Sequence, residues 1–322
     1  MKAFLRDWML IIAILSGVAA YFIYVSIPWL DSTHDFVADA VGIIQPVLIF
    51  IMLFLTFCRV NPKEMRLNKW HLWLLLMQGG LFVGIGCVLA GMPQGSLRVI
   101  LEGAMICLIC PTATAAAVVT RKLGGDVNSV TSYTILVNLL CAVLIPVMIP
   151  FVHPHPEMSV LKSALIIMAK VFPLLLMPFL CAIGLRRISP ALTAKIGAHS
   201  DLAFYIWAFS LALAIAVTTR SIVHCTLDLS TELWLVAVSL ICCLFQFWFG
   251  RKIGRKYGDH ITSGQAMGQK NTVLAIWMGT TFFTPVTAIV GGFYSIWHNL
   301  ANSWQLYHHR HPGKQARTEY SK

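Results

Sequence analysis

The chain has 322 residues, of which 58% are hydrophobic and only 11% are charged, whereas about a quarter of the residues in soluble domains are charged. Its mean hydropathy of +0.75 leaves too few polar side chains to cover soluble domains, and its composition excludes disordered and collagen-like chains. The net charge of +11 and the nine dispersed cysteines therefore favour an all-α polytopic membrane protein over a disulfide scaffold.

The sequence contains ten segments of about 20 mostly apolar residues, the length that an α-helix needs to cross a membrane. In chain order, the predicted spans are 8–30, 37–58, 70–91, 98–120, 127–151, 161–185, 202–219, 229–250, 265–287 and 288–306. The loops between them are too short to hold a soluble catalytic domain. Function is therefore expected inside the membrane or at its two surfaces.

The distribution of Lys and Arg orients these spans, because basic residues concentrate in short cytoplasmic loops. With the N-terminus inside, nineteen of the 24 basic residues lie in cytoplasmic segments, and only Arg98, Lys162 and Arg220 lie on the opposite side. Lys170 and Lys270 fall within spans. We expect a multi-pass protein of the cytoplasmic (inner) membrane with both termini in the cytoplasm, surrounded by membrane lipids and binding no nucleic acid.

Ten spans divide into two sets of five, at residues 1–160 and 161–322. An odd number of spans inserts the second set upside down, which predicts the inverted repeat found in many secondary transporters. The fourth and ninth spans hold equivalent places, and both are interrupted, by Pro111 and by the polar segment 263–272. Because unwound backbone is tolerated in a membrane only inside the protein or beside a wet cavity, we predict two discontinuous helices. A plain proline kink is the alternative for the fourth span alone.

Four motifs occur in register with this topology. They are CPTATAAAVVT at 110–120, GGDV at 124–127, GQKN at 268–271 and YSIWHN at 294–299. Together they resemble the bile acid:sodium symporter superfamily over nearly the whole chain. The resemblance implies a panel domain from spans one, two, six and seven, and a core domain from spans three to five and eight to ten, in which the broken helices cross. It also implies alternating-access transport of organic anions, from bile acids to small carboxylates, usually driven by sodium.

Most positions that the resemblance assigns to sodium ligands lack side-chain oxygens here. Ala116 and Ala117 stand where the family has Ser and Asn, Val130 where it has Ser, and Ala266 where it has Glu. Shifting the register by one residue would place Gln265 at the glutamate position. Neither register supplies the carboxylate that a hard cation prefers.

Lys270 stands where the family has a glutamine, while Gln78 and Thr134 match retained ligands. We predict that Lys270 supplies the positive charge of a sodium ion, with Gln78, Thr134, Gln265 and Gln269 as the other coupling residues. If its ammonium keeps its proton, transport is uncoupled from sodium. If it exchanges that proton during the cycle, protons replace sodium. A lysine that only ties together the carbonyl ends of the crossing helices is the structural alternative.

The resemblance places five residues at the substrate: Thr114, Asn271, Thr272, His298 and Asn299. Their side chains form a set of donors suited to a carboxylate, and a half-helix beginning at Asn271 would add backbone amides. A histidine satisfied by neighbouring helices is the alternative for His298. Lys170 lines the anion path or pairs with a buried acid such as Glu102.

The predicted function is secondary active transport of a bile-acid-like or small carboxylate anion, with altered or absent sodium coupling. The alternative is an uncoupled channel-like or sensory protein on the same fold. An enzyme is not expected, because Asp126 has no second membrane Asp with which to form a catalytic dyad. Cys107 and Cys110 lack a second pair at metal spacing, so neither a metal nor a cofactor is predicted.

Overall fold

The computed structural model describes residues 2–60, 64–198, 200–225 and 227–310. Within these ranges the chain is helical, and its only β-type pairing is an isolated antiparallel bridge between Thr112 and Lys270. Residue 1 and the predicted cytoplasmic tail at 311–322 lie outside the described residues.

Six segments are long and apolar enough to cross a membrane. They lie in α1 (Lys2–Val25), η1 with α2 (Pro28–Thr33 and His34–Cys58), α3 (Lys69–Ala90), α6 (Val127–Val152), α10 (Ser200–Val223) and α11 (Leu229–Arg255). The pair α7 (Val160–Leu175) and α8 (Met177–Ile188) makes a seventh candidate. The chain is therefore an all-helical polytopic membrane protein.

The predicted span 161–185 is bent rather than continuous. Its two halves, α7 and α8, meet at Leu176 with a bend of 44°. Pro173 lies inside α7 and Pro178 in the first turn of α8. Each proline removes a backbone donor and disfavours helical geometry at the preceding residue, so the helical hydrogen bonding weakens on both sides of Leu176. A short helix, α9 (Pro190–Ala198), follows and was not predicted.

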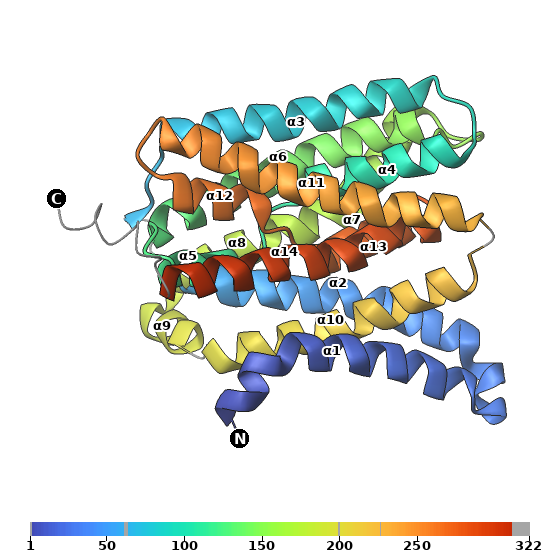
Figure 1. Ribbon diagram of the computed structural model, residues 1–322, viewed down its shortest axis with the longest axis horizontal. Helices are drawn as coiled ribbons and strands as arrows, with labels where there is room; N and C mark the ends of the chain where they lie inside the picture. Colours follow the sequence, from blue (N-terminus) through green and yellow to red (C-terminus); the bar gives the residue numbers. More distant parts are fainter. Residues whose placement is uncertain (1, 61–63, 199, 226, 311–322) are drawn as a thin grey trace.

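The predicted spans 98–120 and 265–287 are each divided into two helices. The first gives α4 (Ser96–Ile109) and α5 (Ala116–Lys122), and the second gives α12 (His260–Gly268) and α13 (Thr272–Phe282). In Figure 1, α5 and α12 lie towards one end of the molecule and α4 and α13 towards the other, with both interruptions between them. After η3 (Pro285–Thr287), the chain ends its described part in α14 (Ala288–Arg310).

Glycines let α11 and α12 approach closely. A Cβ at Gly254 would lie 1.8 Å from Ser263 Oγ, and one at Gly250 would lie 2.6 Å from the Ser263 carbonyl oxygen. A Cβ at Gly268 of α12 would in turn lie 2.3 Å from the Phe247 ring. Small residues spaced by four let helix backbones touch inside a membrane. They fix α12 against α11 and so position the second interruption.

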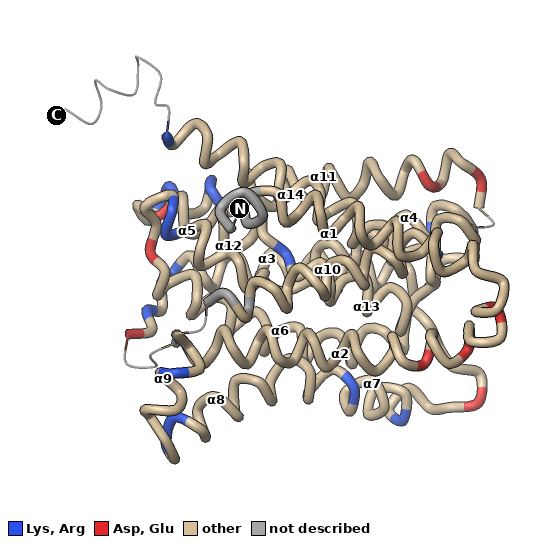
Figure 2. The backbone as a smooth tube through the Cα atoms, turned by 90° about the horizontal axis from the view of Figure 1, so that it is seen from below, with Lys and Arg blue, Asp and Glu red and all other residues tan. Residues whose placement is uncertain are grey.

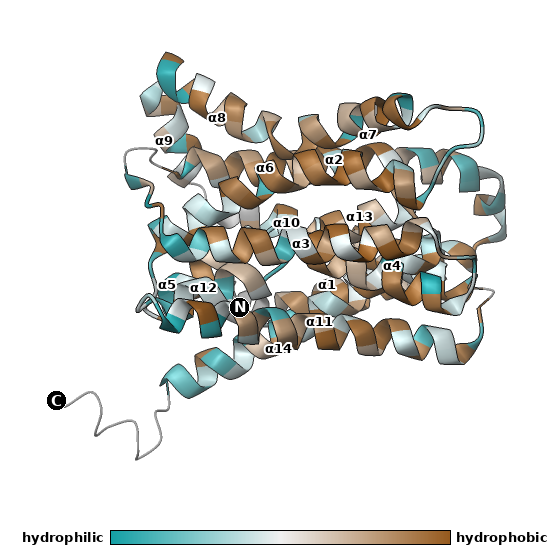
Figure 3. Ribbon diagram, turned by 90° about the horizontal axis from the view of Figure 1, so that it is seen from above, coloured by the Kyte–Doolittle hydropathy of each residue, from teal (hydrophilic) through white to brown (hydrophobic). Residues whose placement is uncertain are grey.

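The outer surface is apolar along the helices and charged at the two ends. Figure 3 shows hydrophobic residues along the flanks of the long helices, and large apolar side chains such as Leu15, Phe36 and Leu161 are exposed there. Contiguous apolar surface of this kind is covered by lipid in a membrane protein. In Figure 2, most Lys and Arg lie at the end near α5, α8 and α12, together with a few acidic residues, and most Asp and Glu lie at the opposite end. We call these the basic end and the acidic end.

A buried ion cluster joins three helix ends at the acidic end. Arg98 of α4 is 4% exposed, and its Nε donates to Glu102 Oε1 at 2.9 Å. His153 Nε2 lies 3.2 Å from the same oxygen. The remaining guanidinium donors bind the carbonyl oxygens of Leu89, Met92 and Val152. Arg98 therefore ties the ends of α3 and α6 to α4. Lys170, by contrast, is exposed on α7.

We expect Glu102→Gln to destabilise the protein by about 3 kcal/mol, because it leaves the buried Arg98 guanidinium without its counter-charge. The matched control is Arg66→Gln, since Arg66 and Asp126 form a 3.6 Å pair in which the Arg66 side chain is 70% exposed. That control should cost at most about 1 kcal/mol. Reversible denaturation of the detergent-solubilised variants measures both values, and equal costs would contradict a structural role for the buried pair.

Candidate functional site

The two interrupted helices meet backbone to backbone near the middle of the molecule. Residues 110–115 separate α4 from α5, and residues 269–271 separate α12 from α13. The hydrogen bonds across this crossing are Ala113 N to Gln269 O (3.0 Å), Asn271 N to Pro111 O (2.9 Å) and Thr112 Oγ1 to Ala266 O (2.6 Å). Each interruption thus supplies the partners that the other has lost, as buried backbone requires.

The Lys270 side chain lies inside this crossing and is 1% exposed. Its Nζ donates to Gln78 Oε1 at 3.0 Å and to the Leu108 carbonyl oxygen at 3.4 Å. Leu108 belongs to the last turn of α4, where the helix dipole is negative. Lys270 belongs to none of the ion pairs Arg66–Asp126, Arg98–Glu102 and His153–Glu102. Oxygen dipoles, rather than a carboxylate, therefore surround this ammonium.

Gln78 of α3 is held so that its oxygen faces the ammonium. Its Nε2 donates to the carbonyl oxygens of Ile109 (2.8 Å) and Cys110 (3.2 Å), which leaves Oε1 to accept. Tyr133 of α6 donates its hydroxyl to the same Oε1 at 3.2 Å. Tyr133 was not predicted, although a buried tyrosine hydroxyl usually needs a partner.

The other predicted coupling residues do not contact the ammonium. Gln269 Nε2 donates to Gln265 Oε1, and Gln265 Nε2 donates to Gln305 Oε1 of α14 at 2.6 Å. These three amides form a row that ends at the crossing, and we call it the glutamine row. The Thr134 hydroxyl bonds the Val130 carbonyl within its own helix, at 2.9 Å.

Of the predicted substrate residues near the second interruption, Asn271, Thr272 and His298 are buried and Asn299 is half-buried. Asn271 Oδ1 accepts from Leu274 N at 3.2 Å and so caps α13, which begins at the buried Thr272. His298 Nδ1 accepts the Lys270 backbone N–H at 3.4 Å. Asn299 Nδ2 donates to a carbonyl of its own helix at 2.7 Å. The structure thus brings Asn271 and His298 to the crossing, while Asn299 bonds within α14.

Thr114 lies in a separate pocket at the basic end, with a volume of about 250 Å³. Hydroxyl and amide groups, two guanidinium groups and one carboxylate line it, together with apolar side chains. The lining residues are Thr56, Arg59, Val60, Glu64, Met65, Thr114, Ala117, Val118, Arg121, Val127, Asn128 and Thr131. These residues come from α2, the connection after α2, the interruption between α4 and α5, α5 and α6, so the pocket joins helices of both predicted domains.

The two arginines give this pocket a positive field. Burial lowers the pKa of Arg59, and the positive charge of nearby Arg121 lowers it further. The carboxylate of Glu64 also lines the pocket, so the two guanidinium groups leave a formal excess of one positive charge there. The Thr114 pocket therefore suits a small anion.

Known proteins give no independent identification. No model of a protein family matches this chain, and no curated protein matches it. The resemblance to the bile acid:sodium symporter superfamily stays a proposal that rests on the four sequence motifs.

A double-mutant cycle tests whether Lys270 is charged and held by Gln78. Gln78→Leu removes the oxygen that accepts from Nζ, so we expect it to destabilise the protein by about 3 kcal/mol. Lys270→Met should cost within about 1 kcal/mol, because it removes the buried charge altogether.

In the double variant, about 2 kcal/mol of the Gln78→Leu cost should be recovered, since the unpaired ammonium is gone. The residual cost reflects the Nε2 bonds to Ile109 and Cys110. The readout is the free energy of unfolding in detergent. Additive costs would show that the two side chains do not interact energetically.

Proposed function

We propose that the protein is a secondary transporter of a small organic anion in which the Lys270 ammonium replaces a coupling sodium ion. It works by alternating access on the ten-helix inverted-repeat plan of the bile acid:sodium symporter superfamily. The observation that carries this proposal is the ammonium at the crossing, bonded to Gln78 and to the Leu108 carbonyl. Side-chain and carbonyl oxygens at such a place are typical ligands of a hard cation.

The helix pattern supports the ten-span plan. Six apolar helices and one bent pair are long and hydropathic enough to cross a membrane. Three further spans bring the number to ten: α4 together with α5, α12 together with α13, and α14 alone. α14 has 23 residues, which is about 34 Å of helix at a rise of 1.5 Å per residue and enough for a hydrocarbon layer of about 30 Å. Its buried His298, Asn302 and Gln305 account for its low hydropathy.

The charges favour an anion as the cargo. The described residues place a buried lysine at the crossing, and two arginines with one carboxylate, Glu64, at the Thr114 pocket. One buried acid, Glu102, lies at the opposite end and is paired with Arg98. Burying a cation inside a membrane costs free energy, so such a residue usually serves a function. A carboxylate or sulfonate would complement this field, whereas a cation would be repelled by it.

The direct test is uptake of labelled carboxylates and sulfonates into proteoliposomes, run in sodium and in choline buffer. We expect saturable uptake at equal rates in both buffers, because the positive charge is covalently attached. Lys270→Met should lower the initial rate at least about tenfold, as expected when a charge-assisted interaction with the substrate path is lost. Lys162→Met, at an exposed lysine in the first turn of α7, is the control and should keep the wild-type rate.

Counterflow of labelled substrate separates a carrier from a pore. A carrier exchanges internal unlabelled substrate for external label, so label accumulates transiently above equilibrium. Absence of this overshoot, with flux retained, would favour the channel-like alternative. Uptake that requires sodium would contradict the assignment of Lys270 as the built-in cation.

The Thr114 pocket generates a second test. Arg121→Gln should raise KM for the anion several-fold with a smaller change in kcat, because the guanidinium attracts the substrate before it reaches the crossing. Added salt should also raise the wild-type KM, because it screens the attraction between the guanidinium and the anion. Lys122→Gln neutralises the next residue, which is exposed and does not line the pocket, and should leave KM within about twofold. Equal effects of the two variants would exclude a specific role for Arg121.

A further inference from the structure

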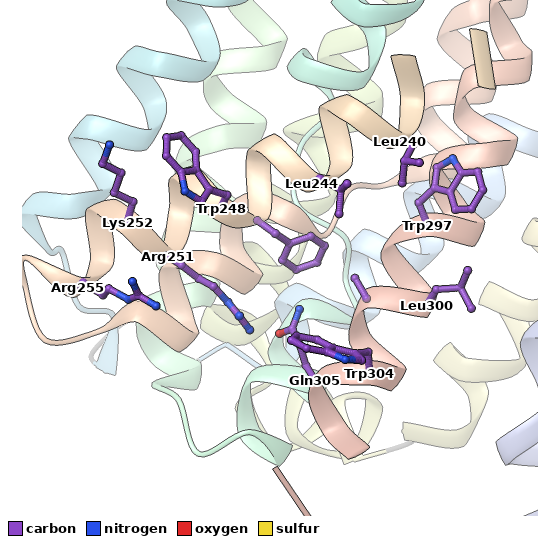
Figure 4. A pocket seen from close by; sticks show the side chains of 12 residues that line it. Leu240, Leu244, Trp248, Arg251, Lys252, Arg255, Trp297, Leu300, Trp304 and Gln305 are labelled. Carbon is purple, nitrogen blue, oxygen red and sulfur yellow. The ribbon is translucent and has the colours of Figure 1, made fainter. Parts of the chain in front are cut away.

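A groove of about 810 Å³ opens between α11 and α14 towards the basic end. Figure 4 shows its two walls, with Arg251 and Arg255 on α11 and with Trp304 and Gln305 on α14. The walls are mainly apolar and aromatic, and the cationic side chains lie at one end. The lining residues are Leu240, Leu244, Phe247, Trp248, Arg251, Lys252, Arg255, Trp297, Leu300, Ala301, Trp304 and Gln305.

The length of the groove matches one leaflet of a bilayer. Leu240, at its apolar end, and Arg251, where the cationic end begins, are eleven residues apart on α11, which is about 16 Å at a rise of 1.5 Å per residue. Half of a hydrocarbon layer of about 30 Å is about 15 Å. A molecule with one acyl chain against Leu240 would therefore carry its headgroup at the level of Arg251.

The cationic end is suited to a phosphate. Guanidinium groups bind phosphate through paired hydrogen bonds, and Arg251 and Arg255 are one helical turn apart on the same helix. Gln305 uses Oε1 to accept from Gln265, so its Nε2 is the end of the amide that remains to donate. Lys252 Nζ lies 4.7 Å from the centre of the Trp248 ring, and this cation–π contact keeps a third positive charge at the rim.

We propose that this groove binds one anionic membrane phospholipid. Its phosphate lies at Arg251, Arg255 and Gln305, and one acyl chain lies along Leu244 and Trp297. The charge of the groove selects the headgroup, and its apolar length selects an acyl chain over a free anion. This site is separate from the Thr114 pocket, and the proposal does not depend on transport activity.

Bound lipid would act on the crossing through contacts that already exist. The Arg251 side chain packs on Gly264 of α12, where an added Cβ would lie 2.6 Å from Arg251 Cγ. Gln305 is the outer end of the glutamine row, whose inner end, Gln269, bonds Ala113 across the crossing. A headgroup that holds Arg251 and Gln305 therefore favours one position of α12 relative to α14.

The test is native mass spectrometry of the delipidated, detergent-purified full chain, titrated with phosphatidylglycerol or phosphatidylcholine of identical acyl chains. We expect one tightly retained phosphatidylglycerol per chain and at least about tenfold weaker retention of phosphatidylcholine, since the choline ammonium cancels the phosphate charge and is repelled by the cationic side chains of the groove. The double variant Arg251→Gln/Arg255→Gln should weaken phosphatidylglycerol about tenfold and reduce the difference in retention between the two lipids. Lys256→Gln, an exposed lysine outside the groove, should change retention less than about twofold.

A second variant separates the acyl chain from the charge. Ala301→Trp places a large ring in the groove and should weaken both lipids while the arginines remain. Thermal unfolding of each variant without added lipid checks that the fold is intact. Equal retention of the two lipids, or full retention by the double arginine variant, would overturn the proposal. So would a stable dimer that Ala301→Trp dissociates and that excludes phosphatidylglycerol, because the groove would then be an interface between two copies.

Discussion

The arrangement at the centre of this protein depends on one buried ammonium and the oxygens around it. Two helices stop in the middle of the molecule, and their free backbone groups pair with each other across the crossing. Lys270 places a positive charge at the negative end of α4, and Gln78 adds an oxygen that is fixed by its own donor bonds. The carbonyl dipoles and the Gln78 oxygen offset the cost of burying this charge. The interruption therefore lets an ammonium lie in the apolar centre of the molecule.

Much of this arrangement could be predicted from the sequence, because the signals were strong and local. Long apolar runs predict membrane helices, and the described chain has six or seven of them. Pro111 and the polar segment 263–272 predicted both interruptions, since helices cannot carry such residues through a membrane without losing hydrogen bonds. Gln78 was named because it matches a ligand position of the family that the sequence resembles, and its Oε1 accepts from Lys270 Nζ in the structure.

Other features could not be predicted because they depend on tertiary contacts. The bend at Leu176 needed two prolines acting together, and the prediction 161–185 treated that span as continuous. Thr134 and Asn299 were chosen by their position in family motifs, yet each bonds a carbonyl of its own helix, an outcome that sequence position cannot reveal. Tyr133 and Gln78 come from segments far apart in the chain, and so do the two arginines of the Thr114 pocket. Only the packing of the helices shows that the members of each pair lie together.

The glutamine row has a direction. Gln269 donates to Gln265, and Gln265 donates to Gln305, so the oxygens of Gln265 and Gln305 each accept from the residue nearer the crossing. Rotating the Gln265 amide alone by half a turn would bring two oxygens face to face on one side and two N–H groups face to face on the other, which loses both buried hydrogen bonds. The row therefore has two favourable states, in which all three amides point outwards or all three point inwards. A change at one end reaches the other as a concerted reversal of polarity, with no movement of the helices that carry it.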